Sequence, residues 1–128
     1  MTDPVTQPCL DVGNGQAPLY IHLERGASID LTVHACPLGY VEWMLAGEPL
    51  QEAVHGTIDR VTSAGATIPL SFPISGTYEL TWAAASSVES WAATSRIESQ
   101  GKELMRQTIA RNKQVSPIIF SVGVEVRS

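Results

Sequence analysis

The sequence predicts a mainly β fold, namely a β-sandwich of about 7–8 short strands with one helix in its C-terminal half. Apolar and polar residues alternate with a period of two in several short stretches of the chain. Turn-forming residues separate these stretches at intervals of roughly 8–12 residues. The 128 residues are enough for one domain with a modest core, so a single sandwich is expected.

The N-terminal segment is expected to be an extended arm. Residues 1–16 contain two prolines and two glycines and show no sustained period. The sandwich domain would then span residues 17–128. The apolar residues of the arm have no pattern that would tie them into their own sheet, so we expect them to contact a neighbouring subunit. These residues are Val5, Leu10 and Val12.

The first regular alternation flanks the stretch Glu24–Ala27, which contains Gly26. Apolar residues fall on one face at every second position before and after this turn. Period two on both sides of a glycine-containing turn predicts an antiparallel hairpin with one solvated face. The inward residues would be Leu19, Ile21, Leu23, Ile29, Leu31 and Val33.

The middle of the chain predicts further short strands. A short apolar run at 40–45 precedes a loop-like segment at 46–56. Residues 57–72 are typical of two strands about a turn at Ser63-Ala64-Gly65, and Pro69 in the second favours an edge or a bulge. The clearest strand is 75–84, where Tyr78, Leu80 and Trp82 alternate with polar residues, so Trp82 is expected in the core.

Residues 86–98 leave two interpretations open. Trp91 and Ile97 could line one face of a strand, whereas Ser95-x-x-Glu98 could be a capping box. We expect a helix over 98–112, although Gly101 near its start weakens the prediction by about 1 kcal/mol relative to alanine. Its apolar stripe would be Leu104, Met105, Thr108 and Ile109. A final strand is expected at 118–126.

Charge is divided unevenly along the chain. The net charge is −5, which argues against a nucleic-acid partner. Residues 1–90 carry a net −8 and residues 91–128 a net +3. The basic segment could attract the acidic body of another subunit, or its charges could simply solvate one face. The candidate contact residues are Lys102, Arg106, Arg111 and Lys113.

Signatures of catalysis and of metal binding are missing from the sequence, so we expect no enzyme and no cofactor. The three histidines lack ligand spacing, and His22 and His34 fall on the polar face of the expected hairpin. Cys9 and Cys36 are most simply free thiols, and a disulfide between them remains open.

Two tryptophans are candidate ligand-binding aromatics. Trp43 and Trp91 could bind a sugar if they are exposed on the sandwich, or could be partly buried packing residues. No targeting signal and no apolar run of about 20 residues is visible, so synthesis in the cytosol and no membrane partner are expected.

The stretch from residue 17 to residue 84 resembles small immunoglobulin-like modules of tailed-bacteriophage structural proteins, such as baseplate and tail-fibre components. The matching features are Arg25-Gly26 at the first turn, the apolar triplet at 29, 31 and 33, and Gly76-Thr77-Tyr78 at the start of a strand. The chain departs from these modules in its expected helix and in the long segment before its last strand.

The resemblance implies an immunoglobulin-like sandwich that serves as a structural subunit of a phage particle, at the tail, the baseplate or the head surface. Its partners would be further copies of itself and other virion proteins, and its location the virion. The alternative is a carbohydrate- or ligand-binding sandwich that uses Trp43 or Trp91. An intracellular enzyme is the third hypothesis.

Overall fold

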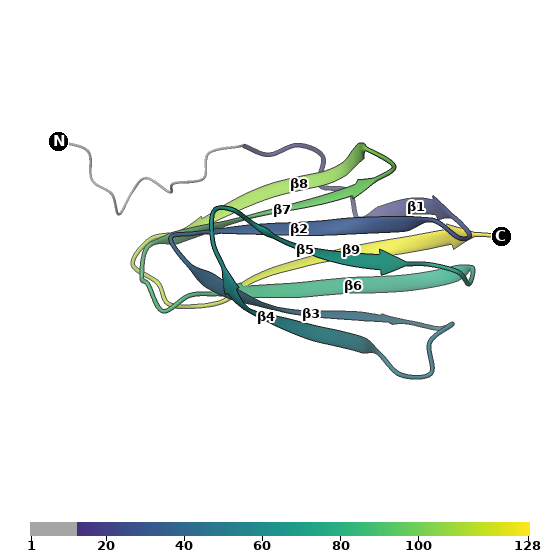
Figure 1. Ribbon diagram of the computed structural model, residues 1–128, viewed down its shortest axis with the longest axis horizontal. Helices are drawn as coiled ribbons and strands as arrows, with labels where there is room; N and C mark the ends of the chain where they lie inside the picture. Colours follow the sequence, from purple (N-terminus) through teal and green to yellow (C-terminus); the bar gives the residue numbers. More distant parts are fainter. Residues whose placement is uncertain (1–12) are drawn as a thin grey trace.

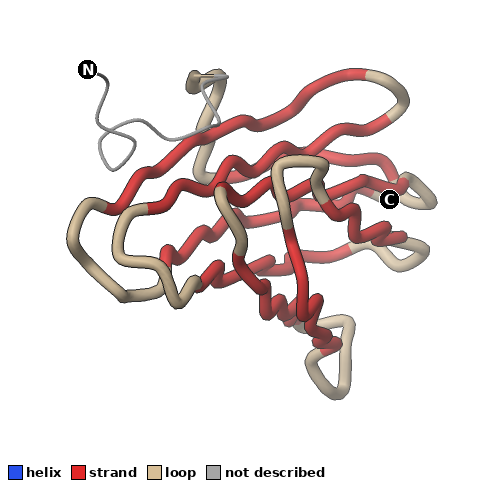
Figure 2. The backbone as a smooth tube through the Cα atoms, turned by 60° about the vertical axis from the view of Figure 1, so that its left-hand side comes forward, coloured by secondary structure: helices blue, strands red, loops and turns tan. Residues whose placement is uncertain are grey.

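The computed structural model describes residues 13–128, and this part of the chain contains nine β-strands and no helix (Figures 1 and 2). It therefore contains no helix that could span a membrane. The strands are β1 (Tyr20–Glu24), β2 (Ser28–Cys36), β3 (Gly39–Gly47), β4 (Val54–Val61), β5 (Ala66–Ser71), β6 (Gly76–Ala85), β7 (Trp91–Ser99), β8 (Lys102–Arg111) and β9 (Ile118–Arg127).

The strands form two sheets that enclose one core, in the manner of a β-sandwich. The five-stranded sheet has the order β1-β9-β6-β3-β4, and the four-stranded sheet has the order β5-β2-β7-β8. Within residues 13–128, β1 and β9 run parallel, whereas the other neighbouring strands run antiparallel. The predicted mainly β class is confirmed, with more strands than expected.

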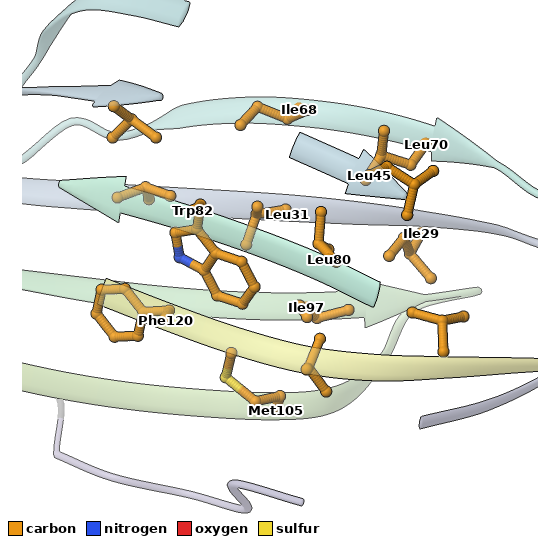
Figure 3. Close-up of a cluster of buried hydrophobic side chains, with 14 of the residues drawn as sticks. Ile29, Leu31, Leu45, Ile68, Leu70, Leu80, Trp82, Ile97, Met105 and Phe120 are labelled. Atoms are coloured by element: carbon orange, nitrogen blue, oxygen red, sulfur yellow. The ribbon is translucent and has the colours of Figure 1, made fainter. Parts of the chain in front are cut away.

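Alternation along the strands builds the core. In β2, Ile29, Leu31 and Val33 are buried, while the residues between them are exposed or half-buried. Trp82 of β6 is fully buried as expected, and its ring stacks on Phe120 with a centroid distance of 5.4 Å. Figure 3 shows Ile29, Leu31, Trp82 and Phe120 among the buried side chains of the core. Burial of such large apolar groups is the main stabilising contribution to the fold.

The expected hairpin around Gly26 is wrong. β1 belongs to the five-stranded sheet and β2 to the four-stranded sheet, so the segment between them crosses from one layer to the other. The backbone N–H of Arg25 donates to the carbonyl of Arg127, and that of Gly26 donates to Phe72. The alternation identified five of the six inward residues correctly, whereas Leu19 is 83% exposed and its expected inward position is wrong. The alternation cannot identify the partner strand, because the buried side chains of both sheets alternate with the same period of two.

The expected helix over 98–112 is also wrong. β7 and β8 form an antiparallel hairpin with Ile97 opposite Met105. Gln100 and Gly101 have positive φ angles of 54° and 77°, as in a tight hairpin turn. Glycine adopts this conformation without steric cost, so the turn explains why position 101 holds a glycine, a residue that disfavours a helix. The strand register shifts next to Ile97, and this shift leaves Leu104 half-buried beside the buried Met105. Two consecutive apolar residues break the period of two, and for this reason the sequence resembled the apolar stripe of a helix.

The ambiguous segment 86–98 is mostly strand. β7 begins at Trp91, and Ser95 lies buried in the strand and is not a helix cap. The turn before β5 is as expected, with Gly65 at a φ of 90°. Pro69 lies in an edge strand, which confirms that prediction. The expected loop at 46–56 is shorter than predicted, because β3 extends to Gly47 and β4 begins at Val54.

The last residues of the expected arm pair with the edge of β8. The N–H of Gly15 donates to the carbonyl of Arg106, and the N–H of Arg106 donates to the carbonyl of Gln16. Asn14 Oδ1 accepts a 2.7 Å hydrogen bond from the N–H of Thr108. For residues 13–16, the expectation that the arm is not tied to its own sheet is therefore wrong.

Cys36 ends β2 and is buried. It is disulfide-bonded, so the expectation of a free thiol at this position is wrong. Cys9 lies outside the described residues.

Candidate functional site: the outer face of the five-stranded sheet

The outer face of the five-stranded sheet presents exposed apolar side chains on β3 and β9, which flank β6. In β3, Val41 and Leu45 point into the core, whereas Tyr40 and Met44 point outward. Ile119 of β9 also points outward, while its neighbour Ile118 is buried. Tyr40, Met44 and Ile119 are 43%, 44% and 61% exposed.

The strand register places these residues around a floor of small side chains. Tyr40 lies opposite Ala85, and Glu42 lies opposite Ala83, which pairs on its other side with Ile119. We call Tyr40, Met44, Ile119, Ala83 and Ala85 the apolar patch. The two alanine side chains are short, but the exposed Glu42 stands between Tyr40 and Met44 on β3, so a carboxylate adjoins the apolar patch.

A shallow groove adjoins the apolar patch and continues onto β4. It is lined by Glu42, Met44, His55, Thr57 and Thr81, together with parts of neighbouring residues. Met44 pairs with His55 on one side and with Thr81 on the other. The groove therefore combines one apolar side chain with several polar groups on a flat sheet.

A second groove lies further along the same face, over β1, β9 and β6. Its lining includes Tyr20, Glu48, Glu79, Ser121 and Gly123. A Cβ atom at Gly123 would collide with the ring of Tyr20, so this ring lies directly on the backbone of β9. The ring is half exposed and stands beside carboxylates, which gives this end of the face an acidic character.

Two histidines make polar contacts, His22 in β1 of the five-stranded sheet and His34 in β2 of the four-stranded sheet. His22 Nδ1 lies 3.4 Å from a carboxylate oxygen of Glu125, and His34 Nδ1 lies 3.1 Å from the carbonyl of Ser63. Neither contact activates a hydroxyl or a thiol, as nucleophilic catalysis requires. No group of three or more His, Cys, Asp or Glu residues placed to hold a metal ion occurs in the described part of the chain.

The two tryptophans expected to bind a ligand differ in position, since Trp43 is among the residues that line the groove on β3 and β4, whereas Trp91 lies in the core. Trp43 is half-buried and packs on Gly56, since a Cβ atom at Gly56 would lie 2.9 Å from the indole ring. Trp91 is only 2% exposed, so it offers no ring face on which a sugar could stack. Its Nε1 has no hydrogen-bond partner.

The basic residues expected to contact neighbours are spread along β8 and do not form one patch. Arg106 lies 3.5 Å from Glu103, and Arg96 lies 2.7 Å from Glu98 and 3.7 Å from Glu103. These arginines therefore have acidic partners within the chain. Lys102 is the first residue of β8, and Lys113 follows the end of this strand. Both are exposed, whereas Arg111, the last residue of β8, is half-buried.

The other expected contact residues, Val5, Leu10 and Val12, lie outside the described residues. Sequence reasoning missed Tyr20, Tyr40, Met44 and Ile119. The signal was present in the alternation for Tyr40, Met44 and Ile119, because each is apolar at a position whose sequence neighbours point inward. Apolar residues that gather at the outward positions of strands, where polar residues are expected, indicate a surface that binds a partner.

Comparisons of the chain with known protein families, with curated proteins and with solved structures find no match in any of the three.

Proposed function

We propose that the chain is a structural subunit of a bacteriophage particle, at the tail, the baseplate or the head surface, which acts through repeated protein–protein contacts. The observation that carries the proposal is the apolar patch on the five-stranded sheet. Large apolar groups that gather on a solvated sheet face are typical of a protein interaction site.

The character of the patch supports a protein partner. Its members belong to three adjacent strands, β3, β6 and β9, which hold them at fixed positions. The patch gives way along the same face to the acidic side chains Glu79 and Glu125. A partner with an apolar centre and a basic flank would complement this face. The apolar contact would supply most of the affinity, and the charges would supply orientation and rate.

The assignment to a phage particle rests on the resemblance of residues 17–84 to phage structural modules. Two of the features that carry it stand at structural positions typical of a scaffold. Gly26 has a φ of 90° in the crossing between the sheets, and Gly76 begins β6 with a φ of 149°. We further propose that the fold is immunoglobulin-like and that the subunit is not an enzyme. Its partners are copies of itself and other virion proteins.

The proposal is tested on phage particles released by cells that encode the chain. Quantitative mass spectrometry of purified particles should find the chain at many copies per particle. A variant with Tyr40→Ser and Ile119→Ser should fold but be depleted from particles. Its matched control, Glu24→Ser on the outward side of β1, should be incorporated normally. Particles that lack the parent chain would contradict the proposal.

A carbohydrate-binding module is the second candidate, and one observation favours it. The half-exposed ring of Tyr20 lies flat on Gly123, next to Glu79 and Ser121. An aromatic face beside polar groups is typical of sugar recognition. Binding of soluble oligosaccharides that Tyr20→Ala abolishes, measured by calorimetry, would support this candidate. No binding to a broad glycan array would exclude it.

A further inference from the structure

The two sheets have four edge strands, and these differ in whether another chain can pair with them. An edge strand exposes unpaired N–H and C=O groups, and natural sheets block such edges to avoid association. The edge strands are β1 and β4 in the five-stranded sheet and β5 and β8 in the four-stranded sheet.

Three of the four edges are blocked. Residues 13–16 cover β8 through the hydrogen bonds between Gly15, Gln16 and Arg106. Pro69 lies within β5 and removes one backbone donor from it. β1 has only 5 residues, and very short edge strands are poor templates for pairing.

β4 is neither covered by another segment of the described chain nor interrupted by proline, and its one irregularity is the register shift after Ile58. It has 8 residues, contains neither proline nor lysine, and places no charge among its inward residues. Among residues 13–128 only β3 pairs with it. Figure 1 shows β4 at the margin of its sheet, on the side opposite β1. Its regular pairing with β3 extends from Val54 to Ile58, where the register shifts.

The inward side of this edge is also incompletely covered. Trp43 and Ile58 are half-buried at the rim of the core, and Val54 is 46% exposed. The apolar layer therefore continues past the point where the four-stranded sheet covers it. A strand added beside β4 would bury more of these side chains.

We infer that β4 pairs with β4 of a second copy of this chain, in antiparallel orientation, with Thr57 opposite Thr57. This inference rests on the proposed function and names one of its repeated contacts. Side chains two residues apart on a strand lie on the same face of the sheet. With Thr57 opposite Thr57, the outward residues of one copy therefore lie beside the outward residues of the other, and the inward residues lie beside the inward ones.

Charge complementarity supports this register. His55 and Asp59 flank Thr57 at equal distances along the strand, with Asp59 immediately beyond the regular pairing. Around the two-fold axis, His55 of each copy lies opposite Asp59 of the other, so two pairs of complementary groups form. On the inward side, Ile58 of each copy lies opposite Gly56 of the other, next to the ring of Trp43 that rests on that glycine.

Cross-linking tests the contact in the purified chain. Thr57→Cys should form a disulfide-linked dimer under mild oxidation roughly tenfold faster than Ser63→Cys, because only the first places two thiols at the spacing of directly paired strands. Ser63 lies in the turn beyond β4 and serves as the matched control. Equal rates for the two variants would overturn the inference.

Two further changes make the test specific. Ile58→Lys places an inward charge on the edge and should return the Thr57→Cys variant to the slow rate of the control. His55→Asp should slow the Thr57→Cys cross-link several-fold, and adding Asp59→Lys should restore it. A thermal melt of each variant confirms folding. Unchanged cross-linking in the folded Ile58→Lys variant would refute the edge contact.

The outcome can be separated from that of the proposed function. Cross-linking of the isolated chain does not depend on particles, whereas mass spectrometry of particles does not depend on β4. Light scattering of the parent chain should show a dimer that dissociates on dilution. If the chain is found in particles but is monomeric at all concentrations, the edge contact is wrong and the structural role stands.

Discussion

Trp82 Nε1 donates a 2.7 Å hydrogen bond to Ser95 Oγ, and this contact joins the two sheets through the core. Both residues are fully buried. Trp82 belongs to β6 and Ser95 to β7, so the only polar group of the largest core side chain is satisfied by the opposite layer.

Loss of this hydrogen bond should destabilise the fold. Ser95→Ala leaves the indole N–H buried without a partner, which costs about 1–3 kcal/mol of unfolding free energy. Urea denaturation of the two proteins measures the difference. A double-mutant cycle with Trp82→Phe separates the hydrogen bond from the packing. Ser95→Ala should cost clearly less in the Trp82→Phe background, and an equal cost in both would show that the bond contributes nothing.

Gly101→Ala distinguishes the hairpin from the helix that the sequence predicted. In a helix the substitution would stabilise the protein by about 1 kcal/mol. In the observed turn, where Gly101 has a φ of 77°, it should destabilise the protein by about 1–2 kcal/mol. The sign of the change in melting temperature decides between them. Gly13→Ala, also at positive φ but outside the strands, is a control for the intrinsic effect of the substitution.

Thr108→Val should release residues 13–16 from the edge of β8. Thr108 Oγ1 donates to the carbonyl of Gly13 at 3.1 Å and also contacts Thr94 Oγ1 at 2.8 Å. Valine preserves the shape but removes the hydroxyl. Hydrogen exchange should then quicken at the amides of Gly15 and Arg106, while the amides of β6 keep their protection. Unchanged exchange at Gly15 would show that the backbone contacts suffice.

The ion pairs of Arg96, with Glu98 in β7 and with Glu103 in β8, should contribute little to stability. Arg96 contacts Glu98 and Glu103, but each of these side chains is about a third exposed. Arg96→Gln should therefore lower the unfolding free energy by at most about 1 kcal/mol. The difference between variant and parent should shrink further in 1 M salt. A salt-independent loss of several kcal/mol would contradict this expectation.

Alternation within single strands was readable from the sequence, as β6 shows. The inward residues Tyr78, Leu80 and Trp82 of β6 were identified, and only the small Ala84 was not named. Such patterns depend only on local geometry and burial. The sequence did not reveal which strands pair with each other. The turn at Gly26 looks the same whether it closes a hairpin or crosses between layers, because the two differ only in distant partners such as Phe72 and Arg127.

The candidate site was harder to predict than the fold. The sequence directed attention to Trp43 and Trp91, yet Trp91 is a core residue and Trp43 is half-buried at the rim of the core. The exposed apolar side chains were hidden because Tyr40 and Ile119 each stand in an apolar run whose other members are buried. Only the register, which brings Ile119 and Glu42 to the same alanine, reveals the surface.

The parallel pairing of β1 with β9 has a consequence for biosynthesis. Tyr20 lies beside Gly123, so the two strands are about a hundred residues apart in the chain. β1 leaves the ribosome early and has no sheet partner until β9 follows. Until β9 has been synthesised, this pairing cannot help to bury the apolar residues Ile21 and Leu23 of β1. Contacts between such distant segments slow folding, so completion of the five-stranded sheet should be a late event in folding.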